Sequence, residues 1–597
     1  MNPTTVLHST SREYVYPVSR NRLKIKLKCI RGQKETYHIV FWNRFHENEV
    51  KTEELKCVGR DAEFDYFMCE LAFIEAVKYI RYYFIISAAD GCKYMGRDGF
   101  SHEKPKDFFE YLYTNEEDIM HVPDWAKGAV IYQVFPERFN NGDTSNDPID
   151  TVDWNTVPTR ENFFGGDLKG IVMKLDYLQE LRVDAIYLNP LFKSPSNHKY
   201  DTTDYFAVDP SFGDNNDLNE LVKECHKRNI KVIFDGVFNH CGFYFQPFQD
   251  VLEKGEASEF KDWFYIESFP VQTDPPNYEC VGYYKLMPKL RFKNRKVRDY
   301  FINVGTYWLK TADIDGWRLD VADEVDFTFW QEFRRAIKSI KKDAILIGET
   351  WKDGRDMLRG DQMDSVMNYL FRDASVEYFA KDEIDTWQFD HLIQRMLFLY
   401  PDAVYPVLYN LIGSHDTPRF LGLCKDNILK MQLAVAFQMT FPGMPAVYYG
   451  DETGLNGEND PDCRKAMNWE NLNQNLLAFY KTMIAIRKES PSLMYGNYQS
   501  ICCDDGVYGY ARQFDMETTY VILNKSNTEK QLTIPLFEDV SEVSDLKSVL
   551  NEMTYQPKEI QAMDCLYHSD IHNYRSIFKM VLPAYHFEII KTGRKHT

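Results

Sequence analysis

The stretch Gly316-Trp317-Arg318-Leu319-Asp320-Val321-Ala322-Asp323-Glu324-Val325 begins as a strand-like run and ends in acidic residues. Side chains at positions i and i+2 of a strand lie on one face, so Arg318 and Asp320 are expected to point the same way. A guanidinium that close favours the ionised carboxylate and would keep Asp320 available as a nucleophile. An isolated Arg-x-Asp pair is more often a structural ion pair, so the surrounding sequence has to decide.

Seven other short apolar segments resemble this predicted strand, and amphipathic segments alternate with them. After the first strand, apolar residues keep the three-to-four spacing of a helix that packs on a sheet: Leu168, Ile171, Val172, Leu175, Leu178 and Leu181. The predicted strands are residues 130–135, 185–189, 232–237, 317–321, 345–349, 365–370, 408–414 and 446–450. Eight strand and helix alternations over roughly 350 residues predict an α/β fold, a (β/α)8 TIM barrel with insertions.

Two flanking domains and one long insertion complete the predicted organisation. Residues 1–122 and 491–597 carry short alternating runs between polar turns, and each predicts a β-sandwich. The barrel would occupy residues 123–490, with an insertion at about 240–294 after its third strand; connections of that size usually shape a site. The aromatic residues of the insertion either stack on a flat ligand or pack a small core of their own. They are Phe243, Tyr244, Phe245, Trp263, Phe264, Tyr265, Tyr283 and Tyr284.

Charge and composition exclude several classes of partner. The chain has 597 residues, and 90 acidic against 70 basic residues give a net charge of −20, which opposes non-specific binding to nucleic acid or to an anionic membrane. No apolar run has the length of a signal peptide at the N-terminus or of a bilayer span later. The 12 cysteines lack the paired spacing of a zinc or redox centre. We therefore expect a soluble, cytoplasmic protein with reduced thiols and a small neutral ligand.

Four predicted strands end in polar residues, in segments 235–240, 318–320, 348–351 and 414–417. The reacting groups of TIM-barrel enzymes lie at the carboxyl ends of the strands, so several carboxylates should converge on one rim. Carboxylates held together without a shared metal push their pKa values apart, which lets one act as a nucleophile while another holds a proton. Cleavage of a glycosidic bond requires such a pair.

These segments resemble the α-amylase family of glycoside hydrolases. Its four signature regions are similar to residues 235–240, 316–325, 348–351 and 410–416. The run Met287-Pro288-Lys289-Leu290 resembles a fifth region found in neopullulanases, cyclomaltodextrinases and maltogenic amylases, and residues 132–139 also look like that branch. The likeness extends to the β module ahead of the barrel, which in this branch commonly pairs two subunits. The resemblance therefore implies a homodimer formed through the N-terminal module.

The resemblance implies a retaining mechanism carried by three acids. Asp320 would attack the anomeric carbon, Glu349 would protonate the leaving oxygen and later activate water, and Asp416 would brace the distorted sugar. Such a mechanism needs the nucleophile and the acid roughly 5 to 5.5 Å apart. Any one of these acids taken alone is more often a solvated loop charge, but all three in order with their flanking residues argue against that explanation.

By the same resemblance, a second set of residues would hold the sugar. Tyr200 would stack under the sugar that is cut, the two histidines would bind its hydroxyls, and Trp351 would line the leaving-group side. Taken singly, such histidines are more often structural, and core packing is the alternative for Tyr200. The substrate-binding residues expected are Tyr200, His240, Arg318, Trp351, His415, Asp460 and Arg464.

A calcium site is expected near residues 141–147, whose clustered side-chain oxygens suit a hard cation. The resemblance adds two ligands from a later Gly-Gly-Asp turn. A hydrated turn rich in Asn and Asp would have a similar sequence. The expected ligands are Asn141, Asp143, Asn146, Asp147, Gly165 and Asp167.

The function implied is hydrolysis of α-1,4 bonds in cyclodextrins, pullulan and maltooligosaccharides, with transfer to sugar acceptors and with α-1,6 cleavage left open. An oligo-1,6-glucosidase and a non-catalytic glucan-binding subunit are the alternatives. Two positions depart from the usual pattern of the branch: Asp323 stands where Asn is common, and Phe327 where His is frequent. Both follow the expected nucleophile, so the substrate preference stays open.

Overall fold

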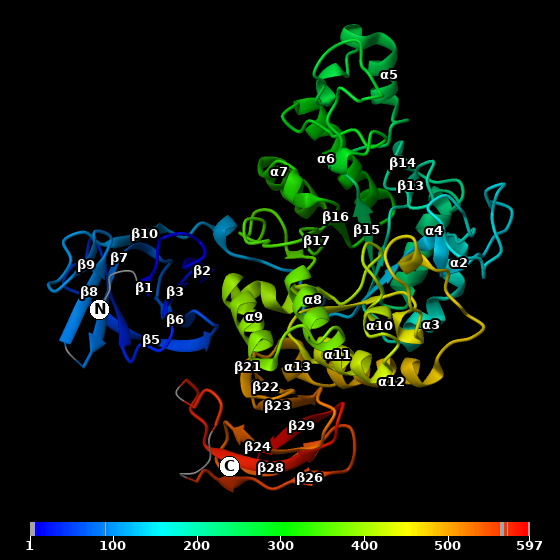
Figure 1. Cartoon of the computed structure of the whole chain (residues 1–597). Coiled ribbons are helices and arrows are strands. Elements are labelled where there is room, and N and C mark those ends of the chain that lie inside the picture. The colour runs from blue at the N-terminus through cyan, green and yellow to red at the C-terminus, as the bar shows by residue number, and fades with distance from the viewer. Residues whose placement is uncertain (1–5, 90, 562–565, 570, 595–597) are drawn as a thin grey trace.

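The protein consists of a central barrel with a β domain beside it and another below it (Figure 1). The structure is a computed structural model that describes residues 6–89, 91–561, 566–569 and 571–594. Its α/β barrel, flanked by an N-terminal and a C-terminal β domain, confirms the predicted fold class. Cys565 lies outside the described residues, and the eleven described cysteines are all free thiols.

The barrel is a closed parallel sheet, which over the described residues runs in the order β18-β17-β16-β15-β12-β11-β20-β19. A parallel bridge between Met367 and Tyr409 joins the two ends of this order and closes the ring. Each of the eight predicted strands is present, most of them shorter than predicted. Their bounds are β11 Ile131–Val134, β12 Ala185–Leu188, β15 Lys231–Gly236, β16 Gly316–Leu319, β17 Ile345–Gly348, β18 Ser365–Val366, β19 Tyr409–Leu411 and β20 Met444–Tyr448.

Helices surround the barrel, and many begin at an Asp or Asn cap whose side chain accepts backbone N–H bonds. The helix predicted over residues 168–181 is divided in two at Lys174, whose backbone leaves the helical region at φ −106° and ψ 5°. The helices of the barrel and its edge are α1 Pro136–Phe139, α2 Leu168–Met173, α3 Leu175–Glu180, α4 Asn215–Lys227, α6 Arg295–Thr311, α7 Phe327–Ile340, α8 Tyr369–Ser375, α9 Thr386–Leu399, α10 Phe420–Leu423, α11 Ile428–Thr440, α12 Gln474–Lys488 and α13 Pro491–Tyr495.

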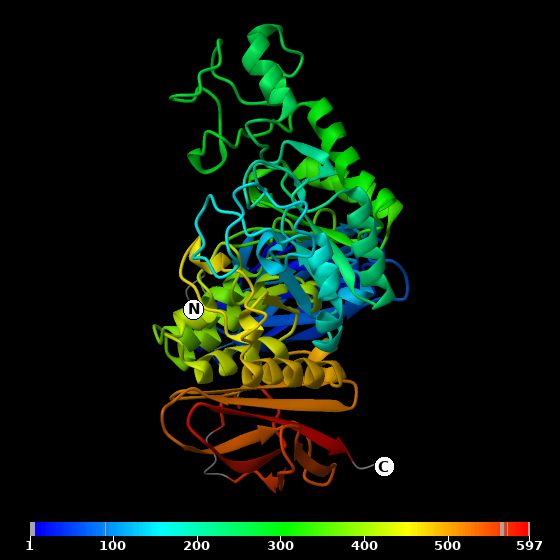
Figure 2. The same ribbon diagram turned by 90° about the vertical axis from the view of Figure 1, so that its right-hand side faces the viewer.

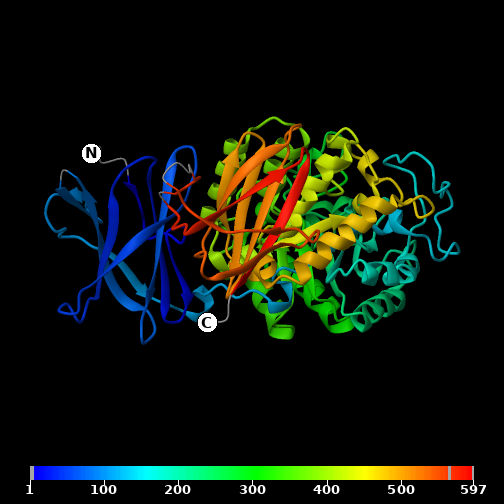
Figure 3. The same cartoon turned by 90° about the horizontal axis from the view of Figure 1, so that it is seen from below.

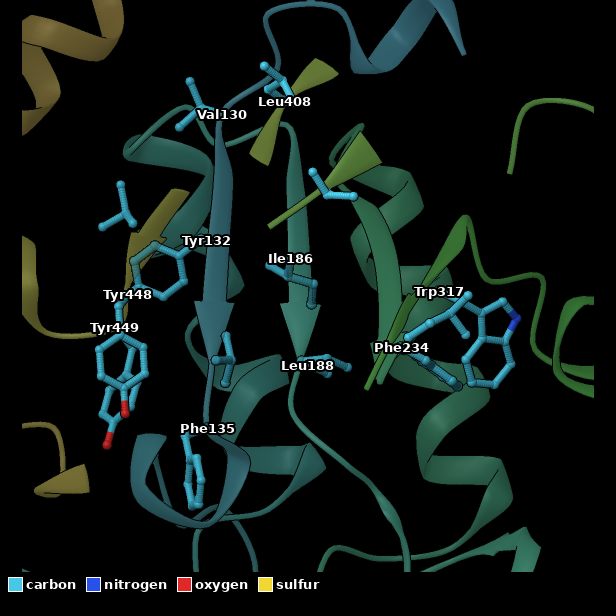
Figure 4. Packing of buried hydrophobic residues seen from close by; sticks show 14 of the residues in the cluster. Val130, Tyr132, Phe135, Ile186, Leu188, Phe234, Trp317, Leu408, Tyr448 and Tyr449 are labelled. Carbon is cyan, nitrogen blue, oxygen red and sulfur yellow. The ribbon is translucent and has the colours of Figure 1, made fainter. Parts of the chain in front are cut away.

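Alternate residues of the barrel strands face two different cores. Tyr132, Ile186 and Phe234 belong to the large core between strands and helices (Figure 4). Their neighbours of opposite parity, Tyr187 and Ile233 among them, pack in a separate cluster inside the barrel. Because side chains alternate along a strand, every second residue points to the inside of the barrel. Polar residues that continue this inward-facing row beyond a strand's carboxyl end therefore lie inside the rim of the barrel.

The N-terminal domain consists of two antiparallel sheets joined through β5, and it contacts α9 of the barrel. Its buried Lys26 donates hydrogen bonds to the carbonyls of Phe398 and Tyr400, at 2.8 and 3.1 Å. The strands are β1 Val6–Leu7, β2 Val15–Ser19, β3 Arg22–Ile30, β4 Thr36–Asn43, β5 Lys51–Arg60, β6 Phe64–Ala72, β7 Lys78–Ala88, β8 Gly91–Gly96, β9 Gly99–Ser101 and β10 Phe109–Tyr113.

The insertion after β15 contains α5 Gln246–Lys254 and projects from the barrel at the end opposite the C-terminal domain (Figure 2). A short antiparallel pair β13 Phe192–Lys193 and β14 Asp204–Val208 lies near its base. The aromatic residues of the insertion differ in their exposure. Phe245, Trp263 and Phe264 are buried and Phe243 is partly buried, whereas Tyr244, Tyr265, Tyr283 and Tyr284 are exposed.

The C-terminal domain is a sandwich of two sheets that packs under the helices of the barrel (Figures 2 and 3). Buried Arg512 of this domain donates to the carbonyl of Thr440 at the end of α11. In the described part of the chain, no helix is long and apolar enough to span a membrane. The strands are β21 Gln499–Asp504, β22 Val507–Phe514, β23 Glu517–Asn524, β24 Lys530–Leu536, β25 Val543–Ser548, β26 Thr554–Tyr555, β27 Lys558–Glu559, β28 Ser576–Leu582 and β29 His586–Arg594.

Candidate active site

Parallel register brings the strand-end acids together. Asp235 of β15 pairs with Arg318 of β16, which pairs with Ile347 of β17. Asp320 comes two residues after Arg318, and Glu349 comes two residues after Ile347. Both side chains therefore also point to the inside of the barrel, one layer nearer its rim. Adjacent parallel strands lie about 4.8 Å apart, so the two acids emerge side by side at the rim.

Arg318 connects three carboxylates. Its Nη1 lies 2.8 Å from Oδ1 of Asp235 and 2.8 Å from Oδ1 of Asp320, and its Nη2 lies 2.6 Å from Oε1 of Glu349. The predicted same-face contact of Arg318 and Asp320 is confirmed. Because Asp320 and Glu349 contact the two terminal nitrogens of one guanidinium, their carboxyl groups lie near each other at the floor of one cavity.

Tyr200 and His415 form a polar wall beside these acids. The Tyr200 hydroxyl lies 2.5 Å from Nε2 of His415, and the two rings are parallel at a centroid distance of 5.4 Å. The same hydroxyl donates to Oδ2 of Asp235 at 2.8 Å. Gln133 lies 2.9 Å from Nδ1 of His415 and donates to Asn189 at 3.0 Å. These contacts fix the orientation of both rings.

On the other side of the acids, acidic and basic side chains alternate. Oδ2 of Asp416 lies 3.0 Å from Nε2 of His415, and its Oδ1 lies 3.1 Å from Nη2 of Arg464. Arg464 in turn pairs with Asp460 at 3.0 Å, and Asp460 pairs with Arg160 at 3.2 Å. This chain extends from the acids toward the edge of the cavity.

His240 and Val321 complete the site around the two acids. Nδ1 of buried His240 lies 4.0 Å from Oδ2 of Asp320, and its Nε2 lies 3.1 Å from the Tyr200 carbonyl. The backbone N–H of Val321 donates to Oε2 of Glu349 at 2.9 Å. Glu349 therefore has polar contacts on both carboxyl oxygens.

A cavity of about 740 Å³ opens over these residues. The insertion contributes Tyr284 and Met287 to its lining, so the long connection does shape the site. Trp351 is 45% exposed at the cavity and stacks on Tyr369 at a centroid distance of 4.2 Å. Buried Arg318 and His415 act from behind the lining. The predicted residues that line the cavity are Tyr200, His240, Asp320, Glu349, Trp351, Asp416, Asp460 and Arg464.

The electrostatics of the three acids differ. Burial raises the pKa of Asp320 well above its ordinary value; Arg318 opposes this shift, and Glu349 adds to it. Burial likewise raises the pKa of Glu349 against the charge of Arg318. Burial acts on Asp416 too, but His415 and Arg464 outweigh it and hold the pKa of Asp416 below its usual range.

Arg318 therefore favours the ionised form of Asp320, as predicted, but burial shifts the pKa of this carboxyl in the opposite direction. Sequence shows the neighbouring charge, whereas the opposing cost of burial appears only once the barrel has closed around the carboxyl. Asp320 and Glu349 contact the same guanidinium, so the protonation of one depends on the other, whereas the lowered pKa of Asp416 favours its ionised form.

The six expected metal ligands also lie together, between α1 and α2. Asn141 donates to Oδ1 of Asp147 at 2.8 Å, and a Cβ on Gly165 would lie 2.4 Å from that same oxygen. Within the described residues, buried Oδ1 atoms of Asn141 and Asn146 have no hydrogen-bond partner. These two oxygens fit a hard cation.

Two of the expected ligands are already engaged by other groups. Asp167 caps α2 and accepts backbone N–H bonds from Gly142, Asp143 and Gly170. Asp143 pairs with Lys169 at 2.5 Å. In the part of the chain described, no cluster of three or more His, Cys, Asp or Glu side chains that could hold a metal is found. Any cation here would depend on amide and carbonyl oxygens together with the carboxylate of Asp147.

The two unusual positions after Asp320 lie outside the cavity lining. Asp323 is exposed on the short turn after β16, and Phe327 is 39% exposed at the start of α7. Neither side chain is part of the surface that surrounds the acids.

Several residues of the site were absent from the predicted set. Asp235 contacts Arg318, Tyr187 donates to Asp235 at 2.6 Å, and Arg160 lines the cavity. Inward parity identifies Tyr187 and Asp235 in the sequence, because both continue the barrel-facing rows. Arg160 comes from a loop without periodicity, and no sequence signal indicates it.

Sequence comparison divides the chain among three domain families. Residues 133–474 match the family described as Alpha amylase, catalytic domain. Residues 1–115 match Alpha amylase, N-terminal ig-like domain, and residues 502–562 match Cyclo-malto-dextrinase C-terminal domain. The catalytic match covers more than half of the chain and includes all three acids.

Whole-chain comparisons agree. The chain is 42% identical over 564 residues to a cyclomaltodextrinase of Thermoanaerobacter pseudethanolicus (strain ATCC 33223 / 39E), covering 92% of this chain and 98% of that protein. It is 42% identical over 601 residues to neopullulanase 2 of Thermoactinomyces vulgaris, covering 99% of both. A solved cyclomaltodextrinase structure superposes with a TM-score of 0.91 at 35% identity, over 99% of this chain and 100% of that one. The chain thus belongs to the α-amylase family of glycoside hydrolases, in the branch of the cyclomaltodextrinases and neopullulanases.

Proposed function

We propose that this glycoside hydrolase cleaves α-glucosidic bonds with retention of configuration, using Asp320, Glu349 and Asp416. One observation carries the proposal: Asp320 and Glu349 contact opposite ends of the Arg318 guanidinium and line the same cavity. Retaining glycosidases need two carboxyl groups about 5 to 5.5 Å apart. A shared guanidinium holds two carboxyls at a separation of that order.

In the first step, Asp320 attacks the anomeric carbon of the bound sugar. The bond from that carbon to the glycosidic oxygen breaks, Glu349 gives its proton to the departing oxygen, and a covalent glycosyl-enzyme ester forms. In the second step, Glu349 takes a proton from water, the water oxygen attacks the anomeric carbon, and the ester bond to Asp320 breaks. The raised pKa of Glu349 supports its role as proton donor, because burial favours its neutral form.

Asp416 stays ionised and suits a different task. Its carboxylate, held by His415 and Arg464, would accept hydroxyl hydrogen bonds from the sugar as the ring distorts. Tyr200 would supply a flat face under that sugar, and His240 would bind its hydroxyls. His415, behind the cavity lining, would hold Tyr200 and Asp416 in place. Asp460 and Arg464 would bind sugars beyond it, while Trp351 would line the side from which the leaving group departs.

The substrates we propose are cyclodextrins, pullulan and maltooligosaccharides, with some transfer of the glycosyl group to sugar acceptors. The support is the likeness to a cyclomaltodextrinase and a neopullulanase over nearly the whole chain.

Incubation with β-cyclodextrin, pullulan and soluble starch tests the proposal. We expect reducing sugar from at least one of them and none from the Asp320→Ala variant, whose circular dichroism should match the wild type. Failure of all three substrates would refute hydrolysis, and binding without turnover would favour a glucan-binding subunit. On pullulan, panose, isopanose and maltotriose report different cuts, and cleavage restricted to α-1,6 bonds would favour an oligo-1,6-glucosidase.

We also propose calcium at the cluster between α1 and α2, in a structural role. Asn141, Asn146 and Asp147 would supply side-chain oxygens and Gly165 its carbonyl. The support is the pair of unpartnered buried amide oxygens. Removing calcium with EDTA should lower the melting temperature and adding CaCl₂ should restore it; equal melting curves would contradict the site.

A homodimer through the N-terminal domain and a cytoplasmic location are further proposals. The free thiols of the described cysteines support a reducing compartment. Sedimentation should give twice the monomer mass at micromolar concentration, and deleting residues 1–122 should give monomers. Cell fractionation should find the protein with cytoplasmic markers; recovery in the medium would contradict the location.

A further inference from the structure

We propose that Val321 is a positioning residue for the proposed general acid: its left-handed backbone aims its N–H at the carboxylate of Glu349 and fixes the orientation of that group. This inference rests on the proposed function of Glu349. It concerns the residue immediately after Asp320, for which the sequence alone indicates no role.

The backbone of Val321 is in a conformation that its side chain disfavours. Its φ and ψ are 44° and 47°, in the left-handed region. A β-branched residue rarely adopts this region, and the conformation costs about 1–3 kcal/mol. Strain of this kind persists only where the surroundings impose it, and it is concentrated at functional sites.

The surroundings impose it through bonds to a single residue. The backbone N–H of Glu349 donates to the Leu319 carbonyl at 2.9 Å, and the N–H of Ala322 donates to the Glu349 carbonyl at 3.1 Å. Between these two, the N–H of Val321 donates to the side-chain Oε2 of Glu349 at 2.9 Å. Three consecutive links therefore hold the backbone and the carboxyl of Glu349 against the residues that flank Asp320.

Because the backbone turns at Val321, its N–H contacts the side chain of Glu349, whereas the N–H of Ala322 contacts the Glu349 backbone. Extended residues alternate their N–H groups between the two edges of a strand. At Val321 the turn breaks that alternation, so that one N–H meets a carboxylate while its neighbour meets a carbonyl. Nearby bonds anchor the turn: the N–H of Asp320 donates to the Gly236 carbonyl at 3.1 Å, and the Trp330 indole donates to the Ala322 carbonyl at 2.9 Å.

The N–H of Val321 should also tune the acid. A donor to the ionised carboxylate favours that form, so it works against the burial that raises the pKa of Glu349. Together with Arg318 on the other oxygen, it would keep the pKa low enough for Glu349 to give up its proton in the first step and take one from water in the second.

Replacing the amide at Val321 by an ester, with the hydroxy-acid analogue of valine, removes the N–H and keeps the side chain. We expect the pKa of Glu349 to rise by about one pH unit, since one bond to a charged acceptor is lost. Infrared difference titration would measure this rise in pKa, with the same ester protein carrying Glu349→Gln as the reference. The basic limb of the pH profile of kcat/KM should move to higher pH by the same amount.

An ester at Ala322 is the matched control, because it removes the neighbouring N–H, which serves the Glu349 carbonyl and not its carboxylate. Its titration and its pH profile should match the wild type. Val321→Gly keeps the N–H and adopts the left-handed region freely, so it should also keep the wild-type limb.

An unchanged pKa in the Val321 ester, or equal changes in both esters, would overturn the inference. If the ester protein does not fold, the Val321→Gly variant decides. A shift of its basic limb of kcat/KM would overturn the inference, because the side chain of Val321, and not its N–H, would then set the pKa of Glu349. A wild-type enzyme that hydrolyses no glucan would refute the proposed function instead, and the infrared titration would still decide the role of Val321.

Discussion

Arg318 contacts Asp235, Asp320 and Glu349 at once, so removing one carboxyl leaves the buried guanidinium paired with the other two. A buried charge that loses its only partner costs several kcal/mol, whereas one that keeps two partners loses far less. Single substitutions of Asp320 or Glu349 should therefore yield folded proteins, and their kinetic effects can be read separately from stability.

The two acids should be separable by the leaving group. Glu349→Ala should lower kcat/KM on a maltooligosaccharide by about 10²- to 10⁴-fold, because the leaving oxygen then departs without a proton. On α-glucosyl fluoride, whose leaving group needs little protonation, the loss should be much smaller. The measurement is the ratio of kcat/KM values on the two substrates.

Asp320→Ala serves as the control for this comparison. Without the nucleophile, both substrates should lose at least about 10⁴-fold. If Glu349→Ala lost as much on the fluoride as on the oligosaccharide, the assignment of Glu349 as proton donor would be contradicted.

At the scale of elements, the sequence predicted each barrel strand because each contains a short apolar run, although most of the strands end earlier than the predicted segments. The division of α2 from α3 at Lys174 could not be predicted, because the apolar spacing runs through it unbroken. The left-handed turn at Val321 has no local signal either, since valine normally favours extended strands. Contacts from a neighbouring strand impose it.

The insertion illustrates the same limit. Its aromatic residues look alike in sequence, yet Trp263 is 5% exposed in its core and Tyr284 is 61% exposed at the cavity. Tyr284→Ala should raise KM about three- to tenfold without changing the melting temperature. Trp263→Ala should destabilise the insertion by about 3–5 kcal/mol. Opposite outcomes for the two variants, read by kinetics and thermal melting, would contradict this division.

Glu452, in the short helical turn Asp451–Thr453 after β20, connects this turn to β11 and α3. It is fully buried, and its Oε1 accepts hydrogen bonds from Tyr132 of β11 and Tyr177 of α3, at 2.8 and 2.6 Å. Burial raises the pKa of Glu452 above its ordinary value, although both tyrosines oppose the shift. The native state thus binds this proton more tightly than the unfolded chain does.

The sign of the pH effect follows. Between the unfolded pKa near 4.3 and the raised folded value, the native state binds more protons, so this contribution to stability is lost as pH rises. Glu452→Gln keeps the acceptor and removes the titration. Between pH 4.5 and pH 8, the free energy of unfolding of this variant should rise relative to that of the wild type. The rise should be about 1.4 kcal/mol for each tenfold difference in the proton affinity of Glu452 between the folded and unfolded states. Denaturant titrations at both pH values would measure this gain, and a constant difference would contradict the raised pKa.

At the scale of the whole molecule, Lys26 links the N-terminal domain to the barrel. It is buried, and its ammonium supplies donors to two carbonyls at the end of α9. Lys26→Met would leave those carbonyls without that donor, at a cost of about 1–3 kcal/mol. Calorimetry should then show the N-terminal domain unfolding at a lower temperature than the barrel.

Lys28→Met on the same strand is the control. Lys28 is partly exposed and lies 3.9 Å from Glu13, so its loss should change little. Equal effects of the two substitutions would contradict a specific role for Lys26. The sequence predicts the two β domains from alternation, but a buried lysine on one of those strands reads there as an ordinary solvent-facing residue.

The most direct test of the account is to trap the covalent intermediate. A fluorinated α-glucosyl fluoride that forms the ester faster than water cleaves it should label the enzyme once, and peptide mass spectrometry should find the sugar on Asp320. The label should disappear in Asp320→Ala. A sugar found on Glu349 or Asp416, or a β-anomeric first product seen by NMR with no label at all, would contradict the central claim.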